Sequence, residues 1–139
     1  MNPRILLAEP NAAFRSIYTH VLESEGYRVH VVGDVTSLFS RMQTSTFDLL
    51  VLDPMIFGAQ ALPLLRKLLN HVPCSRVLIF TSISQPQWLE LSSEMGTCDY
   101  LLKGKTSPNL LVSRLDEIVT WLSHEENATT RERDNRLPA

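Results

Sequence analysis

Polar side chains that could take part in one reaction directly follow four apolar runs of the sequence. Asp53 ends the run 49–52, and Glu9 follows the run 4–8. Thr81, with Ser82 beside it, follows residues 77–80, and Lys103 follows residues 99–102. A carboxylate nucleophile, a second carboxylate, a hydroxyl donor and an ammonium suit phosphoryl transfer, because cations and donors balance the charge on the phosphoryl oxygens.

Each of these residues also has a purely structural interpretation. Asp53 could simply start a turn with Pro54, Glu9 could be a solvated turn acid, Thr81 a strand-end cap and Lys103 a surface charge. The sequence has no glycine-rich phosphate loop of the Walker or dinucleotide type, which argues against nucleotide binding. It also has no GxSxG motif and no Cys/His pair to suggest acyl transfer. A phosphatase or mutase acting through an aspartyl phosphate is also disfavoured, because Met stands two residues after Asp53 where a general acid would be needed.

Strand-like and helix-like segments alternate along the chain and would bring these residues together. Apolar or β-branched runs predict five strands, and amphipathic spacing with Asn, Pro or Gly at the ends predicts five helices between and after them. The strands are expected at 4–8, 27–32, 48–52, 77–80 and 99–102, and the helices at 12–25, 35–43, about 63–69, 87–95 and 108–122. Right-handed crossovers then predict an α/β fold, a three-layer, doubly wound, five-stranded parallel sheet with its carboxyl ends at one edge.

Composition sets limits on partners and location. Thirteen basic and fifteen acidic residues give a net charge of -2, which predicts no direct nucleic-acid binding. Apolar runs are too short for a membrane span and no leader segment is evident, so we expect no membrane association and a cytoplasmic location. Cys74 and Cys98 lie far apart and are expected to be buried thiols rather than metal ligands or a redox pair.

The last part of the chain differs in composition from the rest. Residues 123–139 are polar and charged with almost nothing to bury, which predicts a frayed or disordered tail. We therefore expect one ordered domain at residues 1–122 followed by a C-terminal tail at 123–139.

Taken in order, these motifs resemble the receiver domain of two-component response regulators, from about Arg4 to Leu122. The resemblance is carried by Ile5-Leu6-Leu7 before the acidic turn, by 48–53 ending in Asp53, by Gly58 five residues later, by 77–81, and by Gly96 followed by Asp99 to Lys103. It implies the flavodoxin-like strand order 2-1-3-4-5.

The resemblance also implies a function and a set of site residues. Asp53 would accept a phosphoryl group from a histidine kinase or phosphotransfer protein, and the domain would then signal to a downstream protein partner. Thr81 and Lys103 would sense the phosphoryl group, and Thr81 and Tyr100 would form the switch. Mg²⁺ would be held by Glu9, Asp53 and the backbone carbonyl of Met55. Such a domain is not an enzyme beyond self-catalysed phosphoryl transfer and autodephosphorylation.

The sequence departs from the family pattern at several of these positions. Pro10 stands where receivers usually carry a second acid, which predicts weakened Mg²⁺ binding. Pro54 removes an N–H directly after the acceptor, Phe57 stands four residues after it where proline is usual, and Gly104 replaces a proline after Lys103. An alternative is therefore a pseudo-receiver that keeps the fold as a phosphorylation-independent interaction module.

One aromatic residue suggests a partner surface. Trp88 falls in the first turn of the fourth predicted helix, at a position that is usually polar and outward in receivers, while Leu89 takes the buried position. An exposed tryptophan is a candidate anchor for a protein partner. The plainer interpretation is that Trp88 is packed in the core.

Overall fold

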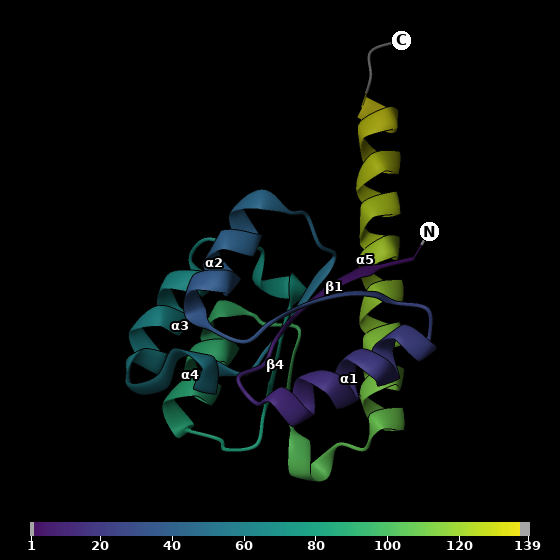
Figure 1. Cartoon of the computed structure of the whole chain (residues 1–139). Coiled ribbons are helices and arrows are strands. Elements are labelled where there is room, and N and C mark those ends of the chain that lie inside the picture. Colours follow the sequence, from purple (N-terminus) through teal and green to yellow (C-terminus); the bar gives the residue numbers. More distant parts are fainter. Residues whose placement is uncertain (1, 137–139) are drawn as a thin grey trace.

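A five-stranded parallel sheet forms the centre of the structure (Figure 1). The computed structural model describes the backbone of residues 2–136 and the side chains of residues 2–126. The strand order is β2-β1-β3-β4-β5, which confirms the predicted order. The strands are β1 (Arg4–Ala8), β2 (Arg28–Val32), β3 (Leu49–Leu52), β4 (Val77–Thr81) and β5 (Asp99–Leu102).

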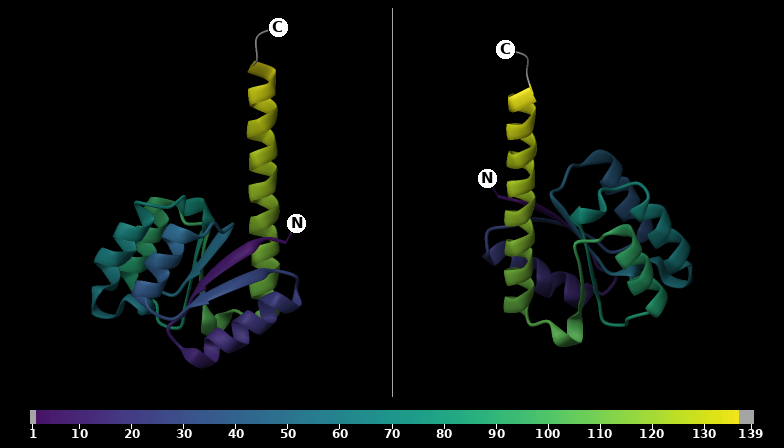
Figure 2. Two further views of the ribbon diagram at one scale, coloured as in Figure 1. Left: turned by 45° about the horizontal axis from the view of Figure 1, so that its top comes forward. Right: turned by 180° about the vertical axis from the view of Figure 1, so that it is seen from behind.

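Helices cover both faces of the sheet and complete the predicted three layers (Figure 2). They are α1 (Ala12–Ser24), α2 (Val35–Thr44), α3 (Ala61–Leu69), α4 (Pro86–Met95) and α5 (Pro108–Arg136). One core cluster joins the sheet to α2, α3 and α4, and the other joins it to α1 and α5. Every residue of the central strands β3 and β4 is buried, because a strand between two helical layers has no solvent face.

Caps fix where several helices begin and end relative to the strands. Asn11 accepts a hydrogen bond from the Phe14 N–H at 3.0 Å, and Ser107 Oγ accepts one from the Leu110 N–H at 3.1 Å. Gly96 ends α4 with a φ of 79°, a left-handed conformation that glycine adopts without strain. The turns between strand and helix are therefore short, and they hold the residues at the strand ends in place.

The C-terminal helix is longer than the sequence predicted. Helix α5 runs to Arg136, so the segment expected to be disordered from Ser123 onward is helical up to that residue (Figure 1). Residues 137–139 lie outside the described part. The prediction used the lack of apolar residues, but Glu, Arg and Ala in this segment have a high intrinsic helix propensity. The division into a domain at 1–122 and a tail at 123–139 stays a prediction.

Trp88 was predicted to be exposed as an anchor for a partner, but it is only 5% exposed and belongs to the core cluster under α4. Leu89 is the outward residue, with 49% exposed. The predicted assignment of these neighbours is reversed: α4 begins at Pro86 and turns position 88, with Leu91, toward the sheet. The exposed tryptophan of the described chain is Trp121 on α5, at 52%.

The burial of Trp88 generates a stability prediction. Trp88→Ala removes a large packed side chain and leaves a cavity, so we expect the free energy of unfolding to fall by about 3–5 kcal/mol. Urea unfolding followed by circular dichroism measures it. Leu89→Ala is the matched control, because an exposed leucine contributes little, and equal losses in the two variants would contradict the placement of Trp88 in the core.

Candidate functional site

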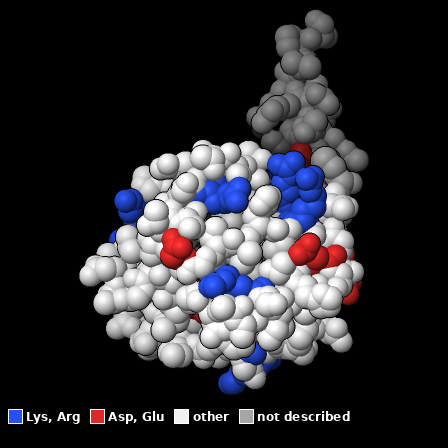
Figure 3. All heavy atoms as spheres, viewed as in Figure 1, with Lys and Arg blue, Asp and Glu red and all other residues white. Residues whose placement is uncertain are grey.

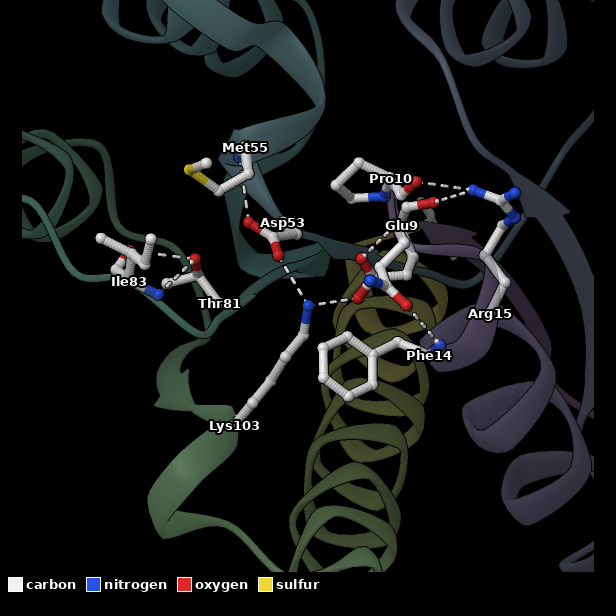
Figure 4. Close-up of polar contacts among 10 residues, drawn as sticks. Glu9, Pro10, Phe14, Arg15, Asp53, Met55, Thr81, Ile83 and Lys103 are labelled. Atoms are coloured by element: carbon white, nitrogen blue, oxygen red, sulfur yellow. Dashed lines mark hydrogen bonds and ion pairs between the residues drawn. The ribbon is translucent and has the colours of Figure 1, made fainter.

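Three charged side chains from three strand ends meet at the carboxyl edge of the sheet (Figure 4). Glu9 follows β1, Asp53 follows β3, and Lys103 follows β5 and opens the short 3₁₀ helix η3 (Lys103–Lys105). The Glu9 N–H donates to the Val32 carbonyl and the Asp53 N–H to the Ala8 carbonyl, each at 3.0 Å. Both acids therefore still belong to the hydrogen-bonded sheet, which holds their backbones rigidly.

Lys103 lies between the two carboxylates. Its ammonium donates to Asp53 Oδ2 at 2.6 Å and also forms an ion pair with Glu9 Oε1. The Lys103 side chain is only 4% exposed. The rings of Phe14 and Phe80 lie 5.0 and 5.6 Å from the Lys103 nitrogen, a distance at which the ring faces attract a cation. Because all three charges are buried, each depends on the others for the solvation that water no longer supplies.

The remaining carboxylate oxygens are bound by backbone N–H groups. Glu9 Oε2 accepts from the Asn11 N–H at 3.0 Å, and Asp53 Oδ1 accepts from the Met55 N–H at 2.9 Å. Pro54 has no N–H, so Met55 supplies the first backbone donor after Asp53. Asp53 thereby caps η1 (Pro54–Gln60), the 3₁₀ segment that leads to α3.

Thr81 and Tyr100, the predicted switch residues, both contact the loop between β4 and α4. Thr81 is fully buried, and its hydroxyl donates to the Ile83 carbonyl at 3.0 Å and accepts from the Ile83 N–H at 3.3 Å. The Tyr100 hydroxyl lies 2.9 Å from Ser84 Oγ. The structure thus brings Glu9, Asp53 and Lys103 into direct contact, while the hydroxyl of Thr81 is turned toward the loop (Figure 4).

Arg15 is a site residue that the sequence analysis missed. Its Nη1 donates to the backbone carbonyls of Glu9 and Pro10, both at 2.9 Å, and so holds the turn that follows β1 (Figure 4). Gly33 makes room for it, since a Cβ at position 33 would lie 2.5 Å from that nitrogen. A lone arginine in a helix gives no specific sequence signal, so only the fold reveals this contact.

The charge of Glu9 also affects the phenol group of Tyr18. Burial raises the pKa of Tyr18, and the negative charge of Glu9 raises the pKa further. Tyr18 packs edge-on against Phe80 with ring centroids 5.0 Å apart, which closes the site from the α1 side.

The two carboxylates of the site are the smallest set of protein ligands that would suit Mg²⁺. Mg²⁺ is commonly bound through one or two carboxylates together with waters and phosphate oxygens, and Glu9 and Asp53 converge on one cation here. Pro10 contributes no carboxylate, and the described residues contain no group of three His, Cys, Asp or Glu side chains that could hold a metal. A metal ion here would depend on two acids and on displacing Lys103 from one of them.

The chain belongs to the response regulator receiver family, because the family model described as "Response regulator receiver domain" matches residues 5–116. The predicted family is therefore confirmed.

Curated relatives agree with this assignment over part of their length. The chain is 31% identical over 100 residues to the alginate biosynthesis transcriptional regulatory protein AlgB of Pseudomonas syringae pv. tomato, covering 72% of the chain and 22% of the relative. It is 30% identical over 117 residues to the DNA-binding response regulator MtrA of Mycolicibacterium paratuberculosis, covering 83% and 50%. The chain thus spans between about a fifth and a half of these relatives.

Solved structures share the fold. A CheY-like receiver domain protein from Methanospirillum hungatei superposes with a TM-score of 0.80 at 21% identity, covering 90% of this chain and 99% of that one. The BeF3-activated N-terminal receiver domain of Klebsiella pneumoniae RstA gives 0.66 at 26% identity, covering 84% and 97%. No helix in the described part of our chain is long and apolar enough to cross a membrane.

Removing the central cation tests the charge cluster. Lys103→Met leaves two buried carboxylates unpaired, so we expect the free energy of unfolding at neutral pH to fall by about 3–5 kcal/mol. Denaturant unfolding measures the loss. Lys105→Met is the control, because Lys105 is exposed two residues away. Adding Glu9→Gln to Lys103→Met should restore part of the stability, and a further additive loss would contradict the mutual dependence of these charges.

The contact between Arg15 and Gly33 gives a second prediction. A methyl group at position 33 collides with the guanidinium, so Gly33→Ala should displace Arg15 and lower the free energy of unfolding by on the order of 1–2 kcal/mol through the lost hydrogen bonds. In an Arg15→Ala background the same substitution should cost almost nothing. A double-mutant cycle by urea unfolding measures the coupling, and additive effects would show that Gly33 has no such role.

Proposed function

We propose that Asp53 accepts a phosphoryl group from the phosphohistidine of a histidine kinase or phosphotransfer protein. The contact that carries this proposal is the one between Asp53 Oδ2 and the Lys103 ammonium at 2.6 Å. In the reaction a carboxylate oxygen of Asp53 bonds to phosphorus, and the bond from phosphorus to the donor histidine nitrogen breaks with its electron pair returning to the imidazole. Lys103 then neutralises part of the charge on the phosphoryl oxygens.

The roles of the surrounding residues follow from their placement. Glu9, Asp53 and the Met55 carbonyl would hold Mg²⁺, which when bound supplies positive charge beside the phosphoryl oxygens. Thr81 would turn its hydroxyl from Ile83 to the phosphoryl group, and the loop that also carries Ser84 would follow. The hydrogen bond between Ser84 and Tyr100 couples that movement to β5. Apart from accepting the phosphoryl group and losing it to water as inorganic phosphate, the chain is assigned no reaction.

The signal would be delivered by contact with a downstream protein, in the cytoplasm. The net charge of -2 supports protein rather than nucleic-acid contact for these residues. AlgB and MtrA, named as a transcriptional and a DNA-binding regulator, extend well beyond the segment they share with this chain. The absence of direct nucleic-acid binding therefore stays a prediction.

A second candidate function is a phosphorylation-independent interaction module. It is favoured by Pro10 in place of an acid and by the pairing of Lys103 with both Glu9 and Asp53, since this cluster is already satisfied without a phosphoryl group.

Intact mass after incubation with phosphoramidate separates the two functions. We expect a Mg²⁺-dependent gain of one phosphoryl group, absent in Asp53→Asn, because only an ionised carboxylate at this position can attack phosphorus. Glu9→Gln should need roughly tenfold or more Mg²⁺ for the same extent of reaction, since it removes one of two metal carboxylates. A wild-type protein that gains no mass at any Mg²⁺ concentration would contradict phosphoryl acceptance by Asp53 and favour the interaction module.

A further inference from the structure

A cavity lies at the edge of the sheet opposite to Asp53, where the strands begin. It has a volume of about 380 Å³ and is lined by residues that include Arg4, Arg28, Phe47, Arg76, Leu122 and Glu126. Figure 3 shows basic side chains gathered on this part of the surface, where β1 begins beside α5. A volume of this size falls in the range of small-molecule sites.

Two of the arginines stand side by side at the start of neighbouring strands. Arg4 and Arg28 open neighbouring parallel strands and are partners in the register of β1 and β2, and both are exposed. Like charges on adjacent strands repel, so this pairing is unfavourable by itself. The Arg28 guanidinium has no hydrogen bond or ion pair with any described residue, and Arg4 reaches only the Thr46 hydroxyl, at 3.4 Å.

Of the two acidic residues in the lining, Glu126 forms an ion pair and Asp48 binds a backbone N–H group. Asp48 Oδ2 accepts the Arg4 backbone N–H at 2.8 Å. Glu126 pairs with Arg76 at 2.5 Å, and Arg76 also donates to the Asp48 carbonyl at 3.1 Å. Arg76 is therefore a structural tie between α5 and the strand ends. The three arginines and two acids of the lining leave one positive charge in excess, and the Arg28 guanidinium is the one without a partner among the described residues.

Part of the remaining lining is apolar. Phe47, Val119 and Leu122 form part of the cavity wall beside the arginines. Phosphate groups match the planar fork of an arginine, and an apolar wall covers a flat organic group. A ligand that has both a phosphate group and a flat organic group would make more contacts in the cavity than a free inorganic anion.

We propose that this cavity binds a phosphate-bearing small molecule with a flat aromatic body, such as a nucleotide, through Arg4 and Arg28 rather than through a glycine-rich loop. The ligand phosphates bridge the two guanidiniums and remove their repulsion, and the face of the aromatic body packs on Phe47 and Leu122. This site is separate from Asp53 and works whether or not Asp53 is phosphorylated.

Isothermal titration calorimetry with ADP, pyrophosphate and adenosine tests the proposal. ADP should bind saturably with one site per chain, pyrophosphate more weakly, and adenosine weakest of all. Arg28→Gln should weaken ADP binding by about tenfold or more, because it removes a charge-assisted contact. Arg66→Gln, on α3 outside the cavity, is the matched control and should bind ADP as the wild type does. Asp53→Asn should also bind normally.

Amide NMR shifts then locate the ligand, with expected changes at Arg4, Arg28 and Phe47. No saturable ADP binding at millimolar concentration would overturn the proposal. Equal losses in Arg28→Gln and Arg66→Gln would show only general charge attraction, and shifts confined to Asp53 and Lys103 would place the anion at the phosphoacceptor. Both results would also overturn it, without bearing on whether Asp53 accepts a phosphoryl group.

Discussion

The interaction on which this site depends is the placement of one buried ammonium between two buried carboxylates. Removing three charges from water costs several kcal/mol each, and only close pairing with further hydrogen bonds offsets that cost. Lys103 supplies the pairing, and the Asn11 and Met55 N–H groups supply the hydrogen bonds. Because the three residues come from β1, β3 and the end of β5, the cluster also fixes the edge strand β5 against the centre of the sheet.

Glu9 and Asp53 are held by the same local arrangement of backbone and side chain. A proline follows each of them, and each carboxylate accepts the N–H of the residue after that proline. Proline removes the nearest donor and favours an extended backbone at the acid, as the φ of -97° and ψ of 112° at Asp53 show. The prolines that make the sequence look like an impaired receiver thus also orient its two remaining carboxylates.

The sequence predicted those features that follow from strand ends, and it failed where side-chain direction decides. The proximity of Asp53 and Lys103 could be predicted from the sequence, because parallel strands place their carboxyl ends at one edge of the sheet. The burial of Trp88 could not be predicted in this way. Trp88 and Leu89 are adjacent apolar residues, and a shift of one position in the assumed buried face of the helix exchanges them. The role of Arg15 could not be predicted for another reason. Its partners are backbone carbonyl groups, which are present at every residue and leave no sequence signal. The continuation of α5 past Ser123 was not predicted, because residues with high helix propensity can extend a helix without showing an apolar pattern in the sequence.

Charge balance links the geometry to the choice between the two functions. Glu9 and Asp53 contribute two negative charges and Lys103 one positive charge, so the ion-paired cluster carries a net charge of -1. An acyl phosphate on Asp53 exchanges one negative charge for about two, a change that a single ammonium already shared with Glu9 does not balance. Stable phosphorylation therefore requires either a second cation or the withdrawal of Glu9 from the cluster. A cation that entered beside Glu9 would free Lys103 for the phosphoryl oxygens, which makes the affinity of Glu9 for a divalent ion the quantity that separates a working phosphoacceptor from an interaction module.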